Sequence, residues 1–308
     1  QLADKIPVSR VRDPEKFTVV TGGAGFLGTH LIKELNSRGQ RRILVVDDLS
    51  DPNKIQNINC LEFLDYTDKD DFISVLDAAC SANLVNEVYH LGAESSTTCT
   101  DGKYLMKNNY QYTCNIMEIC ASARVPLVYA SSASVYGEQT KEWGNFNDKS
   151  DDYTPQSYYA LSKLQADKYA RKFAANPKEY IIGLRYFNVM SDGEHEQHKS
   201  QKSPLCWMRE QYNRSGFVQL FEGSKDYYRD FIHVDEAIKT TINAMTQGKT
   251  GVYNLGMGEA KSFYDLALEV VDNEDQIKFI PMPEDIAKGY QTYTKADMTN
   301  ACFGIPTS

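Results

Sequence analysis

The sequence lacks long apolar runs and an excess of positive charge. None of its apolar runs approaches the roughly 20 residues that a membrane-spanning helix requires. Lysine and arginine number 33 against 42 aspartates and glutamates, and the formal net charge is −9. This balance argues against general affinity for nucleic acid or anionic membranes. We therefore expect no membrane insertion and no nucleic-acid partner.

Paired cysteines and metal-ligand clusters are missing as well. The seven cysteines are odd in number and form no Cys-x-x-Cys pair, which favours reduced thiols over a disulfide framework. His195 and His198 lie close together in the sequence, but we find no supporting cluster with metal-site spacing and predict no metal site. Reduced thiols indicate a cytoplasmic protein. The alternative is the mitochondrial matrix, or another reducing organelle, after removal of a targeting peptide.

Short apolar runs alternate with longer amphipathic segments up to about residue 190. The apolar runs are too short for helices and predict strands at 17–23, 42–48, 61–65, 87–92, 126–132 and 180–187. Helices are predicted near 25–38, 68–79, 104–123 and 157–175. This alternation predicts an α/β fold with a Rossmann-type, doubly wound parallel sheet.

Beyond residue 190 the alternation loosens, and strand-like runs mix with short helices. We predict a dinucleotide-binding domain over 14–188 and about 229–256. A smaller, interleaved C-terminal substrate domain is expected over about 189–228 and 257–308. A cleft at the carboxyl ends of the strands is where open α/β sheets bind ligands. Residues 1–13 are expected to be an N-terminal extension, left by removal of a targeting peptide or by trimming.

A glycine-rich turn joins the first predicted strand to the first predicted helix. Gly22, Gly25 and Gly28 have the spacing G-x-x-G-x-x-G. Small residues there let the backbone approach a pyrophosphate, which then lies at the positive helix N-terminus. We expect this turn, with Phe26 and Leu27, to bind a dinucleotide. The alternative is a tight strand–helix turn without a ligand.

Acidic residues close the next two predicted strands. Asp47, followed by Asp48, stands where an acid commonly hydrogen-bonds an adenosine ribose. Lys54 either reaches a 2′-phosphate, which favours NADP over NAD, or is a solvated loop lysine. Asp65 either caps the adenine or caps the helix that follows it.

The segment SYYALSK at 157–163 contains a tyrosine and a lysine at helical spacing. Tyr159 and Lys163 are four residues apart, so a helix places them on one face. Such a pair alone is typical of a protein surface and gains meaning only from its context. Tyr158 has Ser162, not a lysine, four residues further on, so Tyr159 is the candidate.

Four motifs supply that context. TGGAGFLG, YASSASVYG, Tyr159-x-x-x-Lys163 and RYFNV occur in this order. Together they resemble the extended short-chain dehydrogenase/reductase family, which contains many nucleotide-sugar epimerases and dehydratases. The segments GAESSTTCTDGKYLMKNNYQYT and LFEGSKDYYRDF are similar to its heptose 6-epimerases, and the resemblance spans about 17–300. It implies transient oxidation and re-reduction of a nucleotide sugar with tightly bound NADP, or alternatively NAD.

The resemblance implies a catalytic role for three of these residues. Tyr159 is expected to transfer the proton. Lys163, together with the nicotinamide charge, is expected to favour the Tyr159 phenolate, and Lys163 is also expected to bind the nicotinamide ribose. Ser132 is expected to hydrogen-bond the reacting oxygen, the alternative being a cap of its own strand end.

The resemblance also implies ligand contacts. Gly92 and Ala93 are expected to leave room for the cofactor, Phe187 to lie beside the nicotinamide, and Asn109 to support the cofactor site. An arginine suits a nucleotide diphosphate because its planar fork binds oxyanions bidentately. The expected substrate-binding residues are Ser95, Ser96, Thr97, Asn188, Arg229, Tyr290 and Gln291. His90 is predicted to be a core histidine.

Three features depart from the family pattern. RYFNV continues as MSDGE, and the following loop is two residues longer than expected. The resemblance also implies a second acid or base, because heptose epimerases use a lysine in this loop. Here that lysine maps to Lys199, with Lys202, His198 or a merely solvated loop as alternatives. Glu94 stands where heptose epimerases typically have a cysteine. Relatives also usually continue through a final helix.

Two classes of function follow. The first is a nucleotide-sugar epimerase, expected to be a homo-oligomer, or an epimerase, dehydratase or reductase acting on another nucleotide sugar. The second is a catalytically altered dinucleotide-binding subunit of a larger assembly, which the altered loop, the missing final helix and the N-terminal extension favour. The presence of Ser132, Tyr159 and Lys163 together favours the enzyme.

Overall fold

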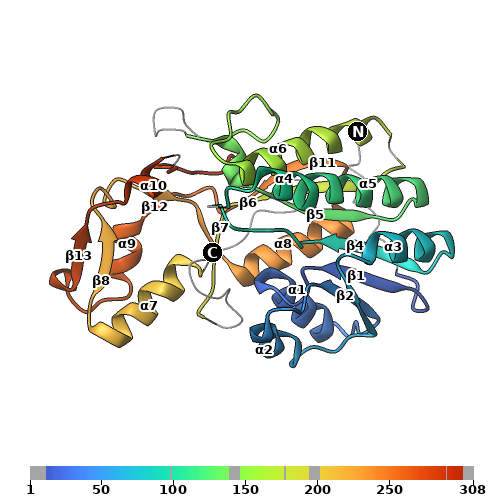
Figure 1. The fold of residues 1–308 in the computed structure, drawn as a ribbon, viewed down its shortest axis with the longest axis horizontal. Helices are drawn as coiled ribbons and strands as arrows, with labels where there is room; N and C mark the ends of the chain where they lie inside the picture. The colour runs from blue at the N-terminus through green and yellow to red at the C-terminus, as the bar shows by residue number, and fades with distance from the viewer. Residues whose placement is uncertain are drawn as a thin grey trace, which may run out of the picture.

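A seven-stranded parallel sheet forms the centre of the molecule (Figure 1). The computed structural model describes residues 12–97, 99–138, 146–176, 178–193, 202–288 and 290–300. In that part of the chain the strand order is β11-β6-β5-β4-β1-β2-β3, and every pairing is parallel. The strands are β1 (Phe17–Thr21), β2 (Ile43–Asp47), β3 (Asp65–Asp68), β4 (Val85–His90), β5 (Leu127–Ser132), β6 (Ile181–Tyr186) and β11 (Gly251–Leu255). The predicted Rossmann-type sheet is confirmed.

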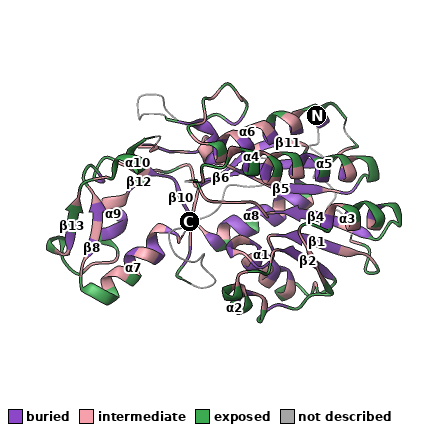
Figure 2. Ribbon diagram, in the orientation of Figure 1, coloured by how far each residue is buried: buried purple, intermediate pink, exposed green. Residues whose placement is uncertain are grey.

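Helices cover both faces of this sheet. One layer contains α1 (Phe26–Ser37) and α8 (Val234–Gln247), and the other contains α3 (Phe72–Ser81), α5 (Tyr112–Ala123) and α6 (Tyr158–Ala170). Successive strand residues point to opposite faces, so Val20 packs with the α1 and α8 layer while Val19 packs with the α3 and α5 layer. Because both faces are buried (Figure 2), the strands read as continuous apolar runs.

The strand order reverses between β1 and β4. The chain runs from β1 outward to β2 and β3, then returns to the other side of β1 and continues through β4, β5 and β6. The chain therefore leaves the carboxyl end of β1 toward one face of the sheet and leaves the carboxyl end of β4 toward the opposite face. Open α/β sheets bind ligands in the crevice at such a reversal.

A smaller lobe lies beyond the carboxyl ends of the strands (Figure 1). Its elements are α7 (Pro204–Ser215), β8 (Val218–Phe221), β9 (Tyr228–Arg229), β12 (Lys261–Ser262), α9 (Phe263–Leu268), β13 (Ile277–Ile280) and α10 (Glu284–Ala287). It has its own apolar cluster, which includes Leu205, Met208 and Leu266. The parallel pair of β7 (Asn188–Met190) and β10 (Phe231–His233) lies between this lobe and the sheet.

Two predicted elements differ from the structure. The strand predicted at 61–65 is wrong, because β3 begins at Asp65 and the apolar Phe63 and Leu64 are exposed. The single helix predicted near 104–123 is divided into α4 (Gly102–Leu105), the π-helical turn η2 (Met106–Gln111) and α5. Among the described helices, none has the length and apolar character needed to cross a membrane.

Candidate active site

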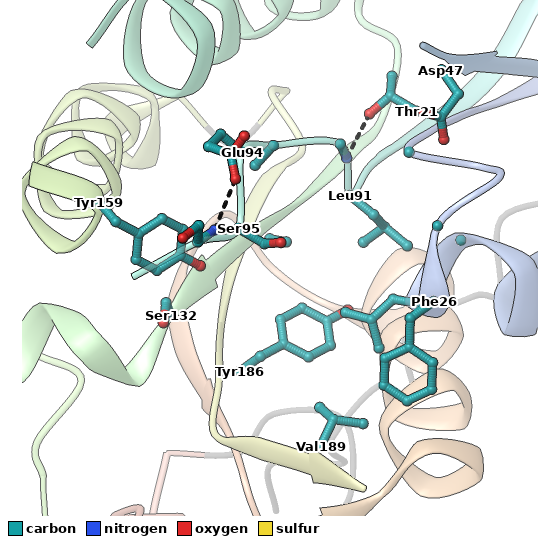
Figure 3. A pocket seen from close by; sticks show the side chains of 18 of the residues that line it. Thr21, Phe26, Asp47, Leu91, Glu94, Ser95, Ser132, Tyr159, Tyr186 and Val189 are labelled. Carbon is teal, nitrogen blue, oxygen red and sulfur yellow. Dashed lines mark hydrogen bonds between the residues drawn. The ribbon is translucent and has the colours of Figure 1, made fainter. Parts of the chain in front are cut away.

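A cavity of about 1030 Å³ opens at the point where the strand order reverses. Its walls come from the glycine turn after β1, the loops after β2 and β4, the end of β5, the start of α6 and the end of β6 (Figure 3). The predicted residues that line it are Gly22, Gly25, Phe26, Leu27, Gly28, Asp47, Asp48, Lys54, Gly92, Ala93, Ser95, Ser96, Thr97, Ser132, Tyr159, Lys163, Phe187 and Asn188. Residues from distant parts of the chain thus share one wall.

The glycine turn is compact because two of its residues cannot carry a side chain. A Cβ atom at Gly28 would lie 2.0 Å from the carbonyl oxygen of Gly22. Gly22 has a φ of +66°, and a Cβ atom there would lie 2.7 Å from Gly92. The helix α1 begins directly after Gly25, which provides no side-chain cap. The first N–H groups of α1 are therefore suited to an anion at the cavity wall, as a dinucleotide pyrophosphate requires.

Asp47 and Lys54 form an ion pair at the far end of the cavity. Asp47 is buried and accepts hydrogen bonds from the backbone N–H groups of Ala24 at 2.8 Å and Asp48 at 2.7 Å. The Lys54 Nζ atom lies 2.5 Å from the Asp47 carboxylate. The hydrogen bond from Ala24 holds Asp47 against the glycine turn, and the ion pair ties the loop after β2 to Asp47 and partly neutralises its charge.

Lys69 also lines the cavity, near Lys54 and Asp48, and the sequence interpretation missed it. It follows Asp68, the last residue of β3. Asp65, which we expected at the adenine, instead lies exposed at the amino end of β3 and does not line the cavity. A correct placement of this strand would have identified Lys69, because the carboxyl ends of parallel strands face the ligand.

Tyr159, Ser132 and Lys163 meet where β5 ends and α6 begins. Ser157 caps α6 by accepting a hydrogen bond from the Ala160 N–H at 3.1 Å, and this places Tyr159 in the first turn. Ser132 Oγ accepts a hydrogen bond from the Ser134 N–H at 3.2 Å, and the Ser132 hydroxyl lowers the pKa of Tyr159. Ser132 therefore caps its own strand end and also acts on Tyr159.

Lys163 lies one turn further along α6 and points toward β5. Its Nζ atom donates to the Ala130 carbonyl at 2.8 Å and lies 5.9 Å from the centre of the Tyr159 ring. Burial lowers the pKa of Lys163 to about 8, and the nearby charge of Asp167 opposes this shift. The amine is thus held in place but is less basic than an exposed lysine.

The surroundings of Tyr159 shift the pKa of its phenol. Burial raises the pKa of Tyr159, the Ser132 hydroxyl works in the opposite direction, and the charge of Glu94 raises the pKa further. In the protein alone Tyr159 is therefore a neutral phenol at pH 7, and the phenolate that we expect Lys163 and the nicotinamide charge to favour together stays a prediction. This state is suited to donating a proton or a hydrogen bond.

The loop after β4 is fixed by Asn109 from the π-helical turn. The Asn109 side chain accepts from the Glu94 N–H at 2.9 Å and donates to the Glu94 carbonyl at 2.9 Å. Asn109 is buried and does not line the cavity, so it supports the loop instead of contacting a cofactor directly. A π-helical turn is a common feature of functional sites.

Three predicted substrate residues lie in the smaller lobe, outside the residues that line the cavity. Arg229 is buried, with its guanidinium 5.4 Å from the Phe263 ring centre and 5.1 Å from that of Tyr290. Gln291 donates to the carbonyls of Ala133 at 3.3 Å and Gly137 at 2.8 Å. Gln291 therefore ties the lobe to the segment after Ser132, whereas we expected it to close over the sugar.

The loop predicted to hold a second acid or base falls mostly outside the described residues. Lys199, His195 and His198 lie in 194–201, of which nothing is described. Lys202 does line the cavity, and its ammonium group pairs with Glu210 on α7. No group of three or more histidines, cysteines or acids is arranged to hold a metal ion in the described part of the chain.

Three residues near the motifs have structural roles. His90 is a core histidine, as predicted: Thr21 and Thr113 hydrogen-bond its two ring nitrogens at 2.6 and 2.8 Å, and burial lowers its pKa to about 3. Tyr136 is fully buried in an aromatic cluster. Tyr158 is 53% exposed and does not line the cavity, which leaves Tyr159 as the tyrosine of the site.

Comparison with known proteins gives a consistent set of relatives. The model of the NAD-dependent epimerase/dehydratase family matches residues 18–256. An ADP-L-glycero-D-manno-heptose-6-epimerase from Brachyspira hyodysenteriae is 41% identical over 289 residues, covering 91% of this chain and 89% of that protein. The structure of the Helicobacter pylori ADP-L-glycero-D-manno-heptose-6-epimerase superposes with a TM-score of 0.80 and 25% identity, covering 96% and 92% of the two chains. The UDP-glucose 4-epimerase of Thermotoga maritima superposes with a TM-score of 0.77 and 25% identity, over 92% and 90%.

Proposed function

Because the chain belongs to the NAD-dependent epimerase/dehydratase family, we propose that it inverts C6 of an ADP-glycero-manno-heptose by transient oxidation and re-reduction. The observation that carries this proposal is the convergence of Ser132, Tyr159 and Lys163 on a cavity whose other end is a glycine turn. A relative with that activity, 41% identical across most of the chain, supports the choice of substrate.

The protein groups supply position and proton transfer. A nicotinamide cofactor, when bound, supplies the hydride acceptor and donor. Ser132 orients the reacting oxygen of the sugar by a hydrogen bond. Tyr159 exchanges its phenol proton with the same oxygen. Lys163, held by the Ala130 carbonyl, places a positive charge near Tyr159 and would bind the nicotinamide ribose. The positive charge of an oxidised nicotinamide would lower the raised pKa of Tyr159 and so prepare it to act as a base.

We assign NADP as the cofactor on the basis of the charges near the ribose end of the cavity. Lys54 already neutralises Asp47, which would otherwise repel a 2′-phosphate. Lys69 adds a second cation at the same wall. The two ammonium groups therefore place positive charge at this wall, and replacing Lys54 and Lys69 by alanine should weaken NADP binding more than NAD binding in a calorimetric titration.

Arg229 is suited to the diphosphate of the substrate. Its guanidinium is buried between two aromatic rings, and burial lowers its pKa. No carboxylate of the described residues forms an ion pair with it. A buried cation without an acidic partner is costly, and a bound diphosphate would provide the missing negative charge.

The decisive experiment identifies the bound nucleotide and follows the reaction. The purified protein is denatured, the released dinucleotide is identified, and native protein is incubated with ADP-D-glycero-D-manno-heptose while NMR monitors C6. We expect NADP and inversion at C6. A protein that carries a dinucleotide but inverts no sugar would favour the catalytically altered subunit. A protein without dinucleotide and without inversion would exclude the proposal.

The second acid or base is proposed to be Lys199, and Lys202 provides a matched comparison. Lys199→Met should nearly abolish C6 inversion while the dinucleotide stays bound, because the reacting oxygen then has no acid or base beside it in the second orientation of the sugar. Lys202→Met removes an amine that pairs with Glu210 and should retain most activity. The reverse order of activities would move the role to Lys202.

A further inference from the structure

Glu94 places a fixed carboxylate in the cavity wall next to the candidate catalytic group. Its backbone is held on both sides by Asn109, through hydrogen bonds of 2.9 Å at its N–H and its carbonyl. Its Oε1 atom accepts the Ser96 N–H at 3.0 Å, as Figure 3 shows. Three hydrogen bonds thus set both the position and the orientation of this carboxylate.

The charge of Glu94 is not compensated within the described residues. No lysine or arginine among them makes an ion pair with Glu94. The Ser96 N–H occupies Oε1, and no described residue donates a hydrogen bond to the other carboxylate oxygen, Oε2. Tyr159 faces it from α6 and responds to its charge, while Lys163 is engaged with Ala130. Glu94 therefore adds a negative charge and a free hydrogen-bond acceptor to the wall that also contains Ser95, Ser96 and Thr97.

We propose that Glu94 selects the sugar: its carboxylate accepts hydrogen bonds from hydroxyl groups beside the reacting carbon and rejects a sugar that carries a carboxylate of its own. Two like charges a few ångströms apart in a partly buried site repel strongly, whereas hydroxyl donors to an ionised acceptor form strong hydrogen bonds. The selected class is a neutral, polyhydroxylated nucleotide sugar. The inference rests on the proposed function, because it assumes that the sugar lies along this wall.

The test measures binding, so it does not depend on turnover. The cofactor-loaded protein is titrated calorimetrically with ADP-mannose, ADP-mannuronate and ADP. We expect ADP-mannuronate to bind at least about tenfold more weakly than ADP-mannose. In Glu94→Gln this ratio should fall toward one, and in Glu94→Asp, which keeps the charge, it should persist. Glu138→Gln, which changes an exposed acid outside the cavity wall, should leave the ratio unchanged.

A second readout follows the phenol of Tyr159. Removing the Glu94 charge should lower the Tyr159 pKa, seen in NMR titration of ¹³C-labelled tyrosine and assigned with Tyr159→Phe. Equal ratios in wild type and Glu94→Gln would overturn the proposal. So would loss of selection in Glu94→Asp and Glu94→Gln alike, or sugars that bind no better than ADP. Failure to invert the heptose would refute the proposed substrate and leave this binding ratio measurable.

Discussion

At the scale of single residues, two adjacent tyrosines allow a matched comparison. Tyr159 lines the cavity together with Ser132, whereas Tyr158 is 53% exposed and lies outside the cavity wall. Tyr159→Phe should lower the rate of C6 inversion by about 100- to 10,000-fold while the dinucleotide stays bound, since a phenyl ring transfers no proton. Tyr158→Phe should leave the rate within about twofold. Similar losses in both variants would contradict the assignment.

Lys163 should limit activity at alkaline pH. Because burial lowers its pKa to about 8, the amine loses its proton, and the site loses a positive charge, as the pH rises through that value. We expect kcat/KM to decline above about pH 8. Lys163→Arg keeps its charge at all accessible pH values, so its residual activity should show no such decline. A wild-type profile that stays flat to pH 10 would show that another group carries the dependence.

At the scale of elements, the glycine turn after β1 has a backbone that leaves no room for a side chain at Gly28. Gly28→Ala would bring a methyl group to 2.0 Å from the Gly22 carbonyl, so the turn and α1 must separate. We expect the purified variant to contain little bound dinucleotide, measured by release on denaturation. Gly25→Ala is the graded control, because its Cβ would lie 3.2 Å from the same carbonyl and its φ is −88°. Full dinucleotide content in Gly28→Ala would exclude this turn as the pyrophosphate site.

The elements of the sheet were predictable because burial on both faces produces continuous apolar runs. β3 was misplaced because the two apolar residues directly before it resemble such a run although they are not buried. Phe63 is 36% exposed and Leu64 is 49% exposed. The π-helical turn η2 was not predicted, because its sequence MKNNYQ contains too few apolar residues to reveal a change of helical period. Its consequence, the Asn109 clamp on Glu94, became visible only in three dimensions.

At the scale of the whole molecule, contacts between the sheet and the smaller lobe were the least predictable part. The motif resemblance gave the residues that line the cavity from the sheet side, because strand ends place them regularly. It did not indicate that Gln291 hydrogen-bonds the carbonyls of Ala133 and Gly137, which lie far from it in the sequence. Such contacts depend on how the two parts pack, and no local pattern encodes them.

Asp230 joins three segments at this junction and should control the stability of the whole chain. It is fully buried, and its carboxylate accepts the N–H groups of Met257 at 2.7 Å, Gly258 at 2.8 Å and Ala296 at 3.0 Å. Asp230→Ala would leave these three donors without their acceptor. At about 1–3 kcal/mol for each buried unpaired group, we expect a loss of at least about 3 kcal/mol. Asp226→Ala, at an exposed aspartate nearby, should change the melting temperature little.

The loss of stability in Asp230→Ala should also depend on pH. Burial raises the pKa of Asp230 from 3.8 to about 6, against the opposing effect of its backbone hydrogen bonds. The folded protein then binds a proton more tightly than the unfolded chain between these values. This contribution to stability is fully present below about pH 4 and is lost as the pH rises through 6. The difference in melting temperature between wild type and Asp230→Ala should therefore be larger at pH 4.5 than at pH 7.5. An equal or smaller difference at pH 4.5 would mean that the carboxylate is ionised in the folded protein and that its three hydrogen bonds outweigh the effect of burial.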